Sequence, residues 1–367
     1  MQNELQDKIQ ALLNRLVAEG KERGAQVTIY VDGKLAADAW AGVADVRSGA
    51  PVDGDTLFPV YSTTKGIVAT VIHLLAERGQ LDYDKPIAYY WPEFAANGKE
   101  GITVRHALSH GSGIPYMPEG VDHEQLCDWD TMCRLVAQLK PAWAANEILR
   151  YHPVTFGWIL GEVARRIDGR AFQPFVEAEI CRRLGITTMF AGIPAELESR
   201  VAFLEEYYEP QPPPATPPPP PNPAEQDIAP CMNPLTGWMN RSDSRQACIP
   251  ASNGIMNARA IARHYAALLP GGVDGVELLP PERIRLALEQ QIPTSGYEEG
   301  VTPPFGLGYR YWEGGSKTGF GHGGYGGSAG YADPRYKVAV GITRNRFSAE
   351  NLTKHVIDEL RGFLREG

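Results

Sequence analysis

Residues 57–87 read LFPVYSTTKGIVATVIHLLAERGQLDYDKPI. From Ser62 to Gly79 the apolar residues recur with helical spacing, but they are spread too widely around the helix for one side to face water. The sequence therefore predicts a helix that is buried at the centre of the protein and has Ser62 at its start.

Ser62 and Lys65 in this stretch form an S-x-x-K pair. Positions i and i+3 lie on one face of a helix, so this spacing brings a hydroxyl and an amine together. A serine hydroxyl is a weak nucleophile until an adjacent base activates it, and the exposed N–H groups of a helix N-terminus favour negative charge beside it. The pair alone is weak support for catalysis, because a capping serine beside a solvated lysine gives the same pattern.

Strands are predicted on both sides of the central helix. Residues 25–42 (AQVTIYVDGKLAADAWAG) alternate apolar and polar residues around Asp32-Gly33, which predicts a hairpin. Residues 319–345 return to strand character with glycine-rich turns. Helices are predicted for residues 1–24, 257–269 and 351–367, and helices with loops for residues 80–200.

Strands at both ends of the chain with helices between them favour an α/β (α+β) fold. We expect an α/β domain from residues 1–60 and 250–367, a mainly helical domain from residues 61–204, and a proline-rich insertion from residues 205–249. Within the insertion, residues 212–223 (PPPATPPPPPNP) are predicted to be an exposed polyproline stretch, because proline lacks the backbone donor. The active site is expected in the cleft between the domains, with the insertion lining its pocket.

Composition and charge exclude several classes of protein. A chain of 367 residues with 43% hydrophobic and 22% charged residues has globular composition, and a formal charge of −9 opposes nucleic acid. No apolar stretch is long enough to cross a bilayer, and charged residues interrupt the N-terminal helix where a signal peptide needs an unbroken apolar stretch. The five cysteines contain no C-x-x-C pair, so we expect a cytoplasmic protein with free thiols, although the sequence leaves a Cys231–Cys248 disulfide open.

Four stretches carry a resemblance to a known family. They are LFPVYSTTKGIVATVIHLLAERGQLDYDKPI, ITVRHALSHGSGIP, YHPVTFGWILGEVARRIDGR and FGHGGYGGSAGYADP. In this order the chain resembles the serine β-lactamase and penicillin-binding-protein superfamily, and specifically the family VIII carboxylesterases and class C β-lactamase-like proteins. The resemblance spans most of the chain and omits the proline-rich segment. It implies a β-lactamase/transpeptidase-like fold, with an antiparallel sheet flanked by terminal helices and a mainly helical domain.

The resemblance also implies catalytic roles for three residues. Ser62 would be the acylated nucleophile, Lys65 its partner, and Tyr151, at the start of a predicted helix, the base of the second motif. Either the tyrosine or the lysine would take the proton of Ser62, which requires a reference pKa near 10 to be lowered. We expect the nearby lysine cation to lower the pKa of Tyr151.

Two motifs depart from the β-lactamase pattern. The second motif, usually Tyr-x-Asn, is here Tyr151-His152-Pro153, which favours ester over lactam cleavage. For the third motif, Lys317-Thr318-Gly319 matches Lys-Thr-Gly by letter, whereas His322-Gly323-Gly324 matches by position and is preferred. By the same alignment, the backbone N–H groups of Tyr325 and Ser62 would form the oxyanion hole.

Two further patterns are interpreted as structural. Gly326-Gly327-Ser328-Ala329-Gly330 fits G-x-S-x-G, but that motif requires a sharp turn from a strand into a helix, and here another strand is predicted to follow. His106 and His110 are spaced like zinc ligands, yet two ligands do not complete a zinc site. A structural role at the end of a helix is therefore preferred for both histidines.

The resulting hypothesis is a serine carboxylesterase that hydrolyses small short-chain esters through an acyl-enzyme, with no metal or cofactor. A β-lactamase, a D-amino-acid peptidase or amidase, and an acyltransferase would use the same chemistry and remain alternatives. A non-catalytic binder that recruits partners through its proline-rich segment is a further alternative. Retention of Ser62, Lys65 and Tyr151 together argues against it. The expected partner is a small-molecule ester, with neither nucleic acid nor membrane, and the oligomeric state is not readable from the sequence.

Overall fold

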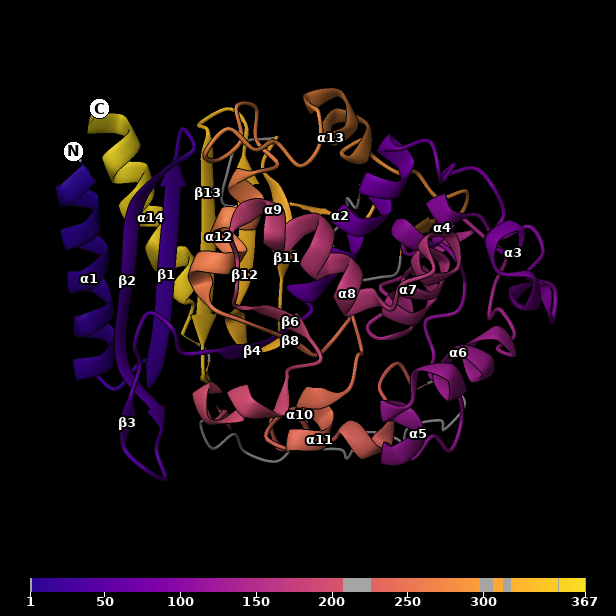
Figure 1. Ribbon diagram of the computed structural model, residues 1–367, viewed down its shortest axis with the longest axis horizontal. Helices are drawn as coiled ribbons and strands as arrows, with labels where there is room; N and C mark the ends of the chain where they lie inside the picture. The colour runs from indigo at the N-terminus through magenta and orange to yellow at the C-terminus, as the bar shows by residue number, and fades with distance from the viewer. Residues whose placement is uncertain (1, 207–225, 298–305, 313–317, 349, 367) are drawn as a thin grey trace.

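The computed structural model describes residues 2–206, 226–297, 306–312, 318–348 and 350–366 (Figure 1). Lys317 and the predicted polyproline stretch at residues 212–223 lie outside these ranges. All five cysteines have free thiols, so the possible Cys231–Cys248 disulfide is not formed. In the described part of the chain, no helix has both the length and the apolar composition needed to cross a bilayer.

An antiparallel sheet of seven strands is built from both ends of the chain. The predicted hairpin is confirmed, and Asp32 and Gly33 at its turn have φ angles of 50° and 71°. Positive φ at both central residues matches the right-handed twist of the flanking strands, and an Asp-Gly pair tolerates it. The strand order is β10 (Arg310–Tyr311), β11 (Phe320–Gly323), β12 (Ala329–Asp333), β13 (Val338–Arg344), β1 (Gly24–Val31), β2 (Lys34–Asp45) and β3 (Ala50–Pro51).

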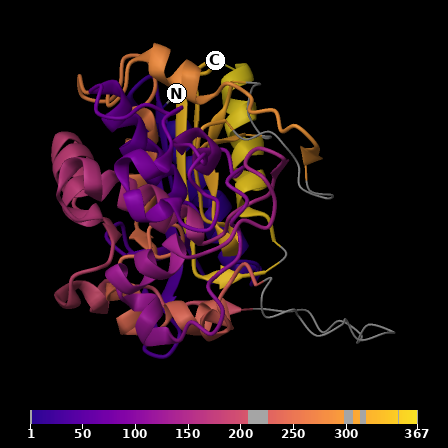
Figure 2. The same cartoon turned by 90° about the vertical axis from the view of Figure 1, so that its right-hand side faces the viewer.

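Two predicted terminal helices cover one face of this sheet, α1 (Gln2–Ala18) and α14 (Leu352–Glu366). They contact each other and lie side by side in Figure 1, and the two ends of the chain lie close together in Figure 2 as well. Between these helices and the sheet lies an apolar core, to which α1 contributes its helically spaced residues. These residues are Leu5, Ile9, Leu12, Leu13 and Leu16.

The other face of the sheet packs against α12 (Ala258–Ala266), which Asn257 caps by accepting a hydrogen bond from the backbone N–H of Ala260. Beyond it lies α2 (Thr64–Glu77), which contacts β11 and is buried from residue 64 to residue 76, as predicted for the central helix. A small sheet of β4 (Phe58–Tyr61), β8 (Gly254–Met256) and β6 (Met189–Ala191) leads into α2. The chain from β4 into α2 carries Ser62.

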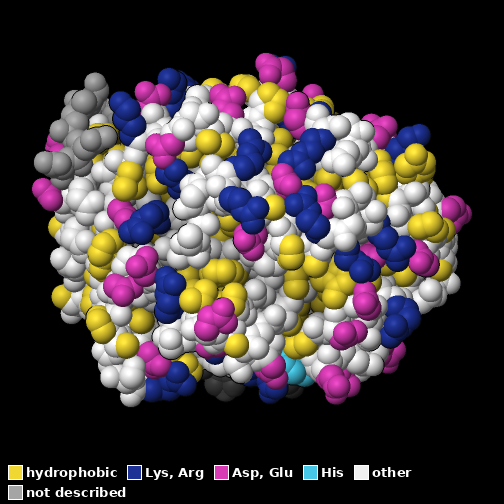
Figure 3. Space-filling view, viewed as in Figure 1, with side chains coloured by type: hydrophobic (Ala, Val, Ile, Leu, Met, Phe, Trp, Pro, Cys, Tyr) yellow, Lys and Arg dark blue, Asp and Glu magenta, His cyan; other side chains and the backbone are white. Residues whose placement is uncertain are grey.

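The remaining elements are mostly short helices, and several of them contact α2 or α7 (Figure 1). The helices are α3 (Ile87–Tyr90), α4 (Val104–Leu108), α5 (His123–Cys127), α6 (Trp129–Ala137), α7 (Thr155–Asp168), α8 (Phe172–Val176), α9 (Arg182–Leu184), α10 (Leu235–Met239), α11 (Ser242–Gln246) and α13 (Pro281–Ala287). Two short parallel pairs join β5 (Ile148–Leu149) to β9 (Gly296–Tyr297) and β7 (Glu205–Glu206) to β14 (Arg346–Phe347). The division of the chain at residues 60, 204 and 249 stays a prediction. On the face shown in Figure 3, positive and negative side chains are intermixed.

Candidate active site

Ser62 lies between β4 and α2 and is partly exposed. Tyr61, directly before it, has a φ of 45°, a conformation that is strained for a bulky residue. The Tyr61 side chain is anchored, because its hydroxyl donates to the carbonyl oxygen of Leu235 at 2.8 Å and its ring meets that of Tyr325 edge-on. These contacts therefore stabilise a sharp bend of the backbone at Tyr61, and Ser62, the next residue, is left accessible at the start of the buried helix.

Lys65 is fully buried beneath Ser62. Its Nζ lies 3.1 Å from Ser62 Oγ, 2.6 Å from the carbonyl oxygen of Pro153 and 2.9 Å from that of Ala251. Burial holds the pKa of this amine well below its usual value, because a low-dielectric site disfavours the charged form. A lysine that loses its proton here has a lone pair within hydrogen-bond distance of the serine hydroxyl.

Tyr151 lies in the loop between β5 and α7, whereas the sequence placed it at the start of a helix. Its side chain borders the same cavity as Ser62 and interacts with it, and Lys65 Nζ lies 4.9 Å from the centre of its ring. Burial raises the pKa of Tyr151 above its usual value, although the interaction with Ser62 and the charge of Arg310 oppose this rise. The expected lowering of the tyrosine pKa is therefore wrong, and Lys65 is the group whose pKa falls.

The two histidines of the zinc-like pattern have different surroundings. His106 Nδ1 accepts a hydrogen bond from the backbone N–H of Thr103 and closes the N-terminal cap of α4. His110 is buried behind Tyr151, with ring centres 4.8 Å apart, and its Nδ1 accepts from the backbone N–H of His152. Within the described ranges, no three His, Cys, Asp or Glu side chains are grouped to hold a metal ion.

A cavity of about 420 Å³ opens at Ser62. Its polar wall brings together most of the residues predicted for the site, namely Ser62, Tyr151, His322, Gly323, Gly324 and Tyr325. Its apolar wall includes Ile228, Met232 and Leu235, which come from the insertion that was expected to line the pocket. Arg310 also lines this cavity and was not identified from the sequence, since a lone arginine on a short strand carries no motif.

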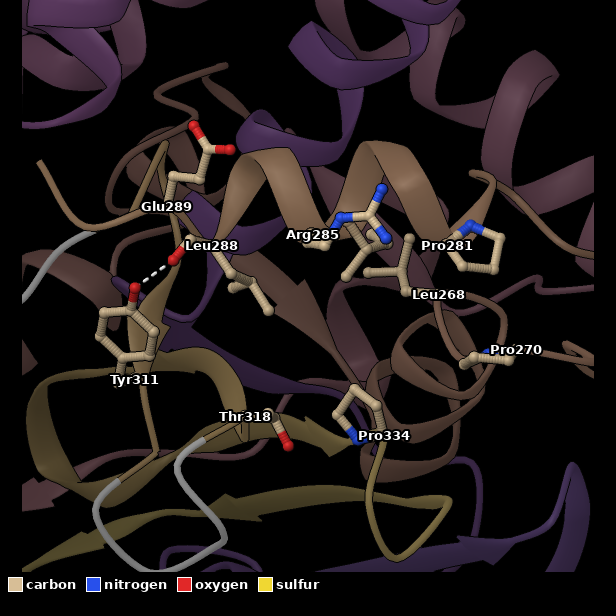
Figure 4. A pocket seen from close by; sticks show the side chains of 10 residues that line it. Leu268, Pro270, Pro281, Arg285, Leu288, Glu289, Tyr311, Thr318 and Pro334 are labelled. Atoms are coloured by element: carbon tan, nitrogen blue, oxygen red, sulfur yellow. Dashed lines mark hydrogen bonds between the residues drawn. The ribbon is translucent and has the colours of Figure 1, made fainter.

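The two candidates for the third motif separate in space. His322-Gly323-Gly324 lies at the end of β11 on the wall of the Ser62 cavity. Thr318 instead lines a different cavity of about 430 Å³ between α13, β10 and the turn at Pro334 (Figure 4). This placement supports the positional match, and Lys317 itself lies outside the described residues.

Ser328 is buried and bound to the backbone rather than to a base. Its Oγ donates to the carbonyl oxygen of Val60 at 2.8 Å and lies 3.1 Å from Thr63 Oγ1. The chain continues from Ser328 directly into strand β12, as predicted. The strand-turn-helix context that a G-x-S-x-G nucleophile needs is therefore missing here.

Comparison with known proteins gives the chain a family. The Beta-lactamase family model matches residues 9–359. Esterase/beta-lactamase LipL of Mycobacterium tuberculosis is 32% identical over 355 residues, which are 93% of this chain and 80% of that protein. Esterase EstB of Burkholderia gladioli is 28% identical over 223 residues, which are 56% of this chain and 55% of that protein.

A solved structure extends the likeness to three dimensions. The crystal structure of a family VIII carboxylesterase superposes with a TM-score of 0.87 at 30% identity, covering 98% of this chain and 97% of that one. This agreement confirms the predicted β-lactamase/transpeptidase-like fold. The chain therefore belongs to the β-lactamase family, as a serine hydrolase with the esterase/β-lactamase fold.

Proposed function

We propose that this protein is a carboxylesterase that hydrolyses small short-chain esters through an acyl-enzyme on Ser62. The observation that carries the proposal is the 3.1 Å contact between Ser62 Oγ and the buried amine of Lys65. A hydroxyl held against an amine whose pKa burial lowers is an activated nucleophile. The names of two relatives, an esterase/beta-lactamase and an esterase, and the carboxylesterase neighbour support an ester as substrate.

In the proposed acylation step, Ser62 Oγ attacks the ester carbonyl while the neutral amine of Lys65 takes its proton. Tyr151, next to Ser62, passes its proton to the departing alcohol oxygen and takes up the proton that Lys65 received, so that both groups end the step in the form in which they began it. The backbone N–H groups of Ser62 and Tyr325 are assigned to the developing oxyanion, because both residues border the same cavity. The products of this step are the free alcohol and an ester of Ser62.

The walls of the cavity favour a small ester. A volume of about 420 Å³ is in the range of small-molecule sites, and Ile228, Met232 and Leu235 offer an apolar surface to a short acyl chain. Pro153 stands where the second motif of the β-lactamases has an asparagine, and its backbone carbonyl accepts a hydrogen bond from Lys65 Nζ. This exchange favours ester over β-lactam substrates.

Hydrolysis of a short-chain p-nitrophenyl ester and of a chromogenic cephalosporin, by wild type and by Ser62→Ala, tests the proposal. We expect ester turnover to fall at least about a thousandfold in Ser62→Ala. We also expect weak or absent cephalosporin cleavage by the wild type. Undiminished ester turnover in the variant would move the nucleophile elsewhere, and dominant cephalosporin cleavage by wild type would replace the esterase by a β-lactamase.

A further inference from the structure

His322 is buried in β11, at the wall of the cavity that contains Ser62. Its Nδ1 lies 2.7 Å from the carbonyl oxygen of Gly323. A carbonyl oxygen only accepts hydrogen bonds, so Nδ1 of the neutral ring donates, and Nε2 is left with a lone pair. His322, the first residue of the third motif, therefore offers a hydrogen-bond acceptor. The lysine at that place in the family's Lys-Thr-Gly motif can only donate.

This Nε2 atom is buried and has no hydrogen-bond partner among the described residues. An unpaired acceptor inside a protein is costly, and in native structures it indicates a water, a ligand or a catalytic role. Protonation does not remove the acceptor near neutral pH. Burial, which is the main cause, and the charge of Arg310 hold the pKa of His322 well below its usual value.

The nearby donors of the site have other partners. The three contacts of Lys65 Nζ go to Ser62, Pro153 and Ala251, and Tyr151 interacts with Ser62. The rings of Tyr151 and His322 have centres 6.1 Å apart and border the same cavity. Arg310 also lines this cavity, but Nε2 has no hydrogen bond to it or to any other described residue. The cavity is therefore the place from which a donor can reach Nε2.

We propose that Nε2 of His322 accepts a hydrogen bond from the water that hydrolyses the acyl-enzyme. This inference rests on the proposed function. A water molecule has two O–H groups, and an attacking water needs one acceptor for the proton it loses and another for the hydrogen it keeps. The base of the Ser62 site is the first acceptor, and His322 is the second, so that the oxygen lone pair of the water is fixed toward the acyl carbonyl.

The step balances without further reactants. The water oxygen bonds to the acyl carbon while one proton passes to the amine of Lys65. The bond from that carbon to Ser62 Oγ then breaks, Oγ takes the proton back from Lys65, and the carboxylic acid leaves. His322 exchanges no proton and orients the second O–H group of the water.

Two substitutions of His322 distinguish the role of the Nε2 acceptor from that of the rest of the imidazole ring. In His322→Asn, an amide N–H can replace Nδ1–H toward Gly323, but no acceptor reaches the position of Nε2. In His322→Gln, the longer side chain carries an amide oxygen to about that position.

With a p-nitrophenyl ester, we expect His322→Asn to release the first p-nitrophenolate within about threefold of the wild-type rate. We expect its steady-state turnover to fall about ten- to a hundredfold, as an acyl-enzyme accumulates that intact mass spectrometry detects, and His322→Gln to recover part of the loss.

Methanol is the sharper probe, because an alcohol has one O–H group and has none left for His322 after giving it to the base. The ratio of methyl ester to free acid, at a fixed methanol concentration, should therefore rise several-fold in His322→Asn and return toward the wild-type ratio in His322→Gln. A role in packing alone would slow both products equally and leave this ratio unchanged.

An unchanged ratio with unchanged deacylation in His322→Asn would overturn the inference. So would a slower first turnover with normal deacylation, which would mean that Nε2 binds the substrate instead of water. Thermal unfolding and the His322→Gln variant show whether His322→Asn is folded. If wild type forms no acyl adduct on Ser62, the proposed function itself is wrong, and this outcome is separate from a failure at His322.

Discussion

Among the residues that the structure describes, two lysines have no exposed surface, and they differ in what their amines contact. Lys65 contacts one hydroxyl, Ser62 Oγ, and two backbone carbonyls. Lys99 contacts three backbone carbonyls, those of Ala96, Ala137 and Leu139. Burial lowers the pKa of both amines, that of Lys99 to about 8. Burial and a lowered pKa therefore do not distinguish a catalytic lysine from a structural one. The group that the amine contacts, a serine hydroxyl or a backbone carbonyl, is what distinguishes them.

The surroundings of Lys99 explain its structural role. Ala137 is the last residue of α6, and Leu139 follows closely after it, so the amine satisfies carbonyls at a helix C-terminus that lack intrahelical partners. A cation is also favoured at that end of the helix dipole. Lys65 instead lies near the N-terminus of α2, where the dipole disfavours a cation and favours the neutral amine.

The largest test of this contrast is the pair Lys65→Met and Lys99→Met. We expect Lys65→Met to lower kcat/KM for a p-nitrophenyl ester between about a hundredfold and ten thousandfold, since it removes the proposed general base. Lys99→Met should keep kcat/KM, per folded molecule counted by fluorophosphonate labelling, within about threefold. Equal losses in both variants would mean that Lys65 is structural, as Lys99 is.

Lys99→Met should instead change stability. It leaves three carbonyls without their donor, and we expect the free energy of unfolding in urea to drop by about 2 kcal/mol. A variant as stable as wild type would contradict the structural role of Lys99. Lys99→Arg, which keeps the charge but not the shape of the donor, is the matched control.

The pH dependence of acylation gives a smaller and more specific test. The neutral amine of Lys65 is the proposed base, so the acylation rate should be constant above the pKa of Lys65 and should decline as pH falls through it. The decline is expected to be about tenfold per pH unit, with its midpoint well below the reference value of 10.5 because burial lowers this pKa. Lys99→Met should show the same pH profile. A shift of the pH profile of acylation in Lys99→Met would mean that Lys99 also affects the base, and would contradict the assignment of that role to Lys65 alone.

Ser328→Ala has the smallest expected effect. Ser328 is a buried hydroxyl near the site whose partners are Val60 and Thr63 instead of an amine. Its removal should cost about 1 kcal/mol of stability and less than about tenfold in ester turnover. A loss of turnover as large as in Ser62→Ala would make Ser328 the better candidate for the nucleophile.

Features with local causes were predicted from the sequence. The Asp32-Gly33 hairpin follows from two residues that accept positive φ, and the buried α2 follows from apolar residues on all its sides. The position of Tyr151 outside α7 was missed. Pro153 explains it, because His152, the residue before this proline, is kept out of helical conformation and the helix begins only at Thr155.

Other features of the site cannot be predicted from the amino-acid sequence. The carbonyls of Pro153 and Ala251 that hold Lys65 are backbone atoms, and only the fold brings them to the amine. The rise in the pKa of Tyr151 depends on how deeply the loop is buried, which spacing does not reveal. The strain at Tyr61 is likewise a property of the folded chain.

The pairing of β1 with β13 joins residues roughly 300 positions apart, such as Ala25 and Arg344. During synthesis the hairpin of β1 and β2 must wait until β13 has been made before its open edge is covered, and closing such a long loop slows folding. Until then the exposed edge of β1 can pair with other chains. Active enzyme should therefore form only after residues 338–344 have left the ribosome, and its yield should depend on chaperones that shield this edge.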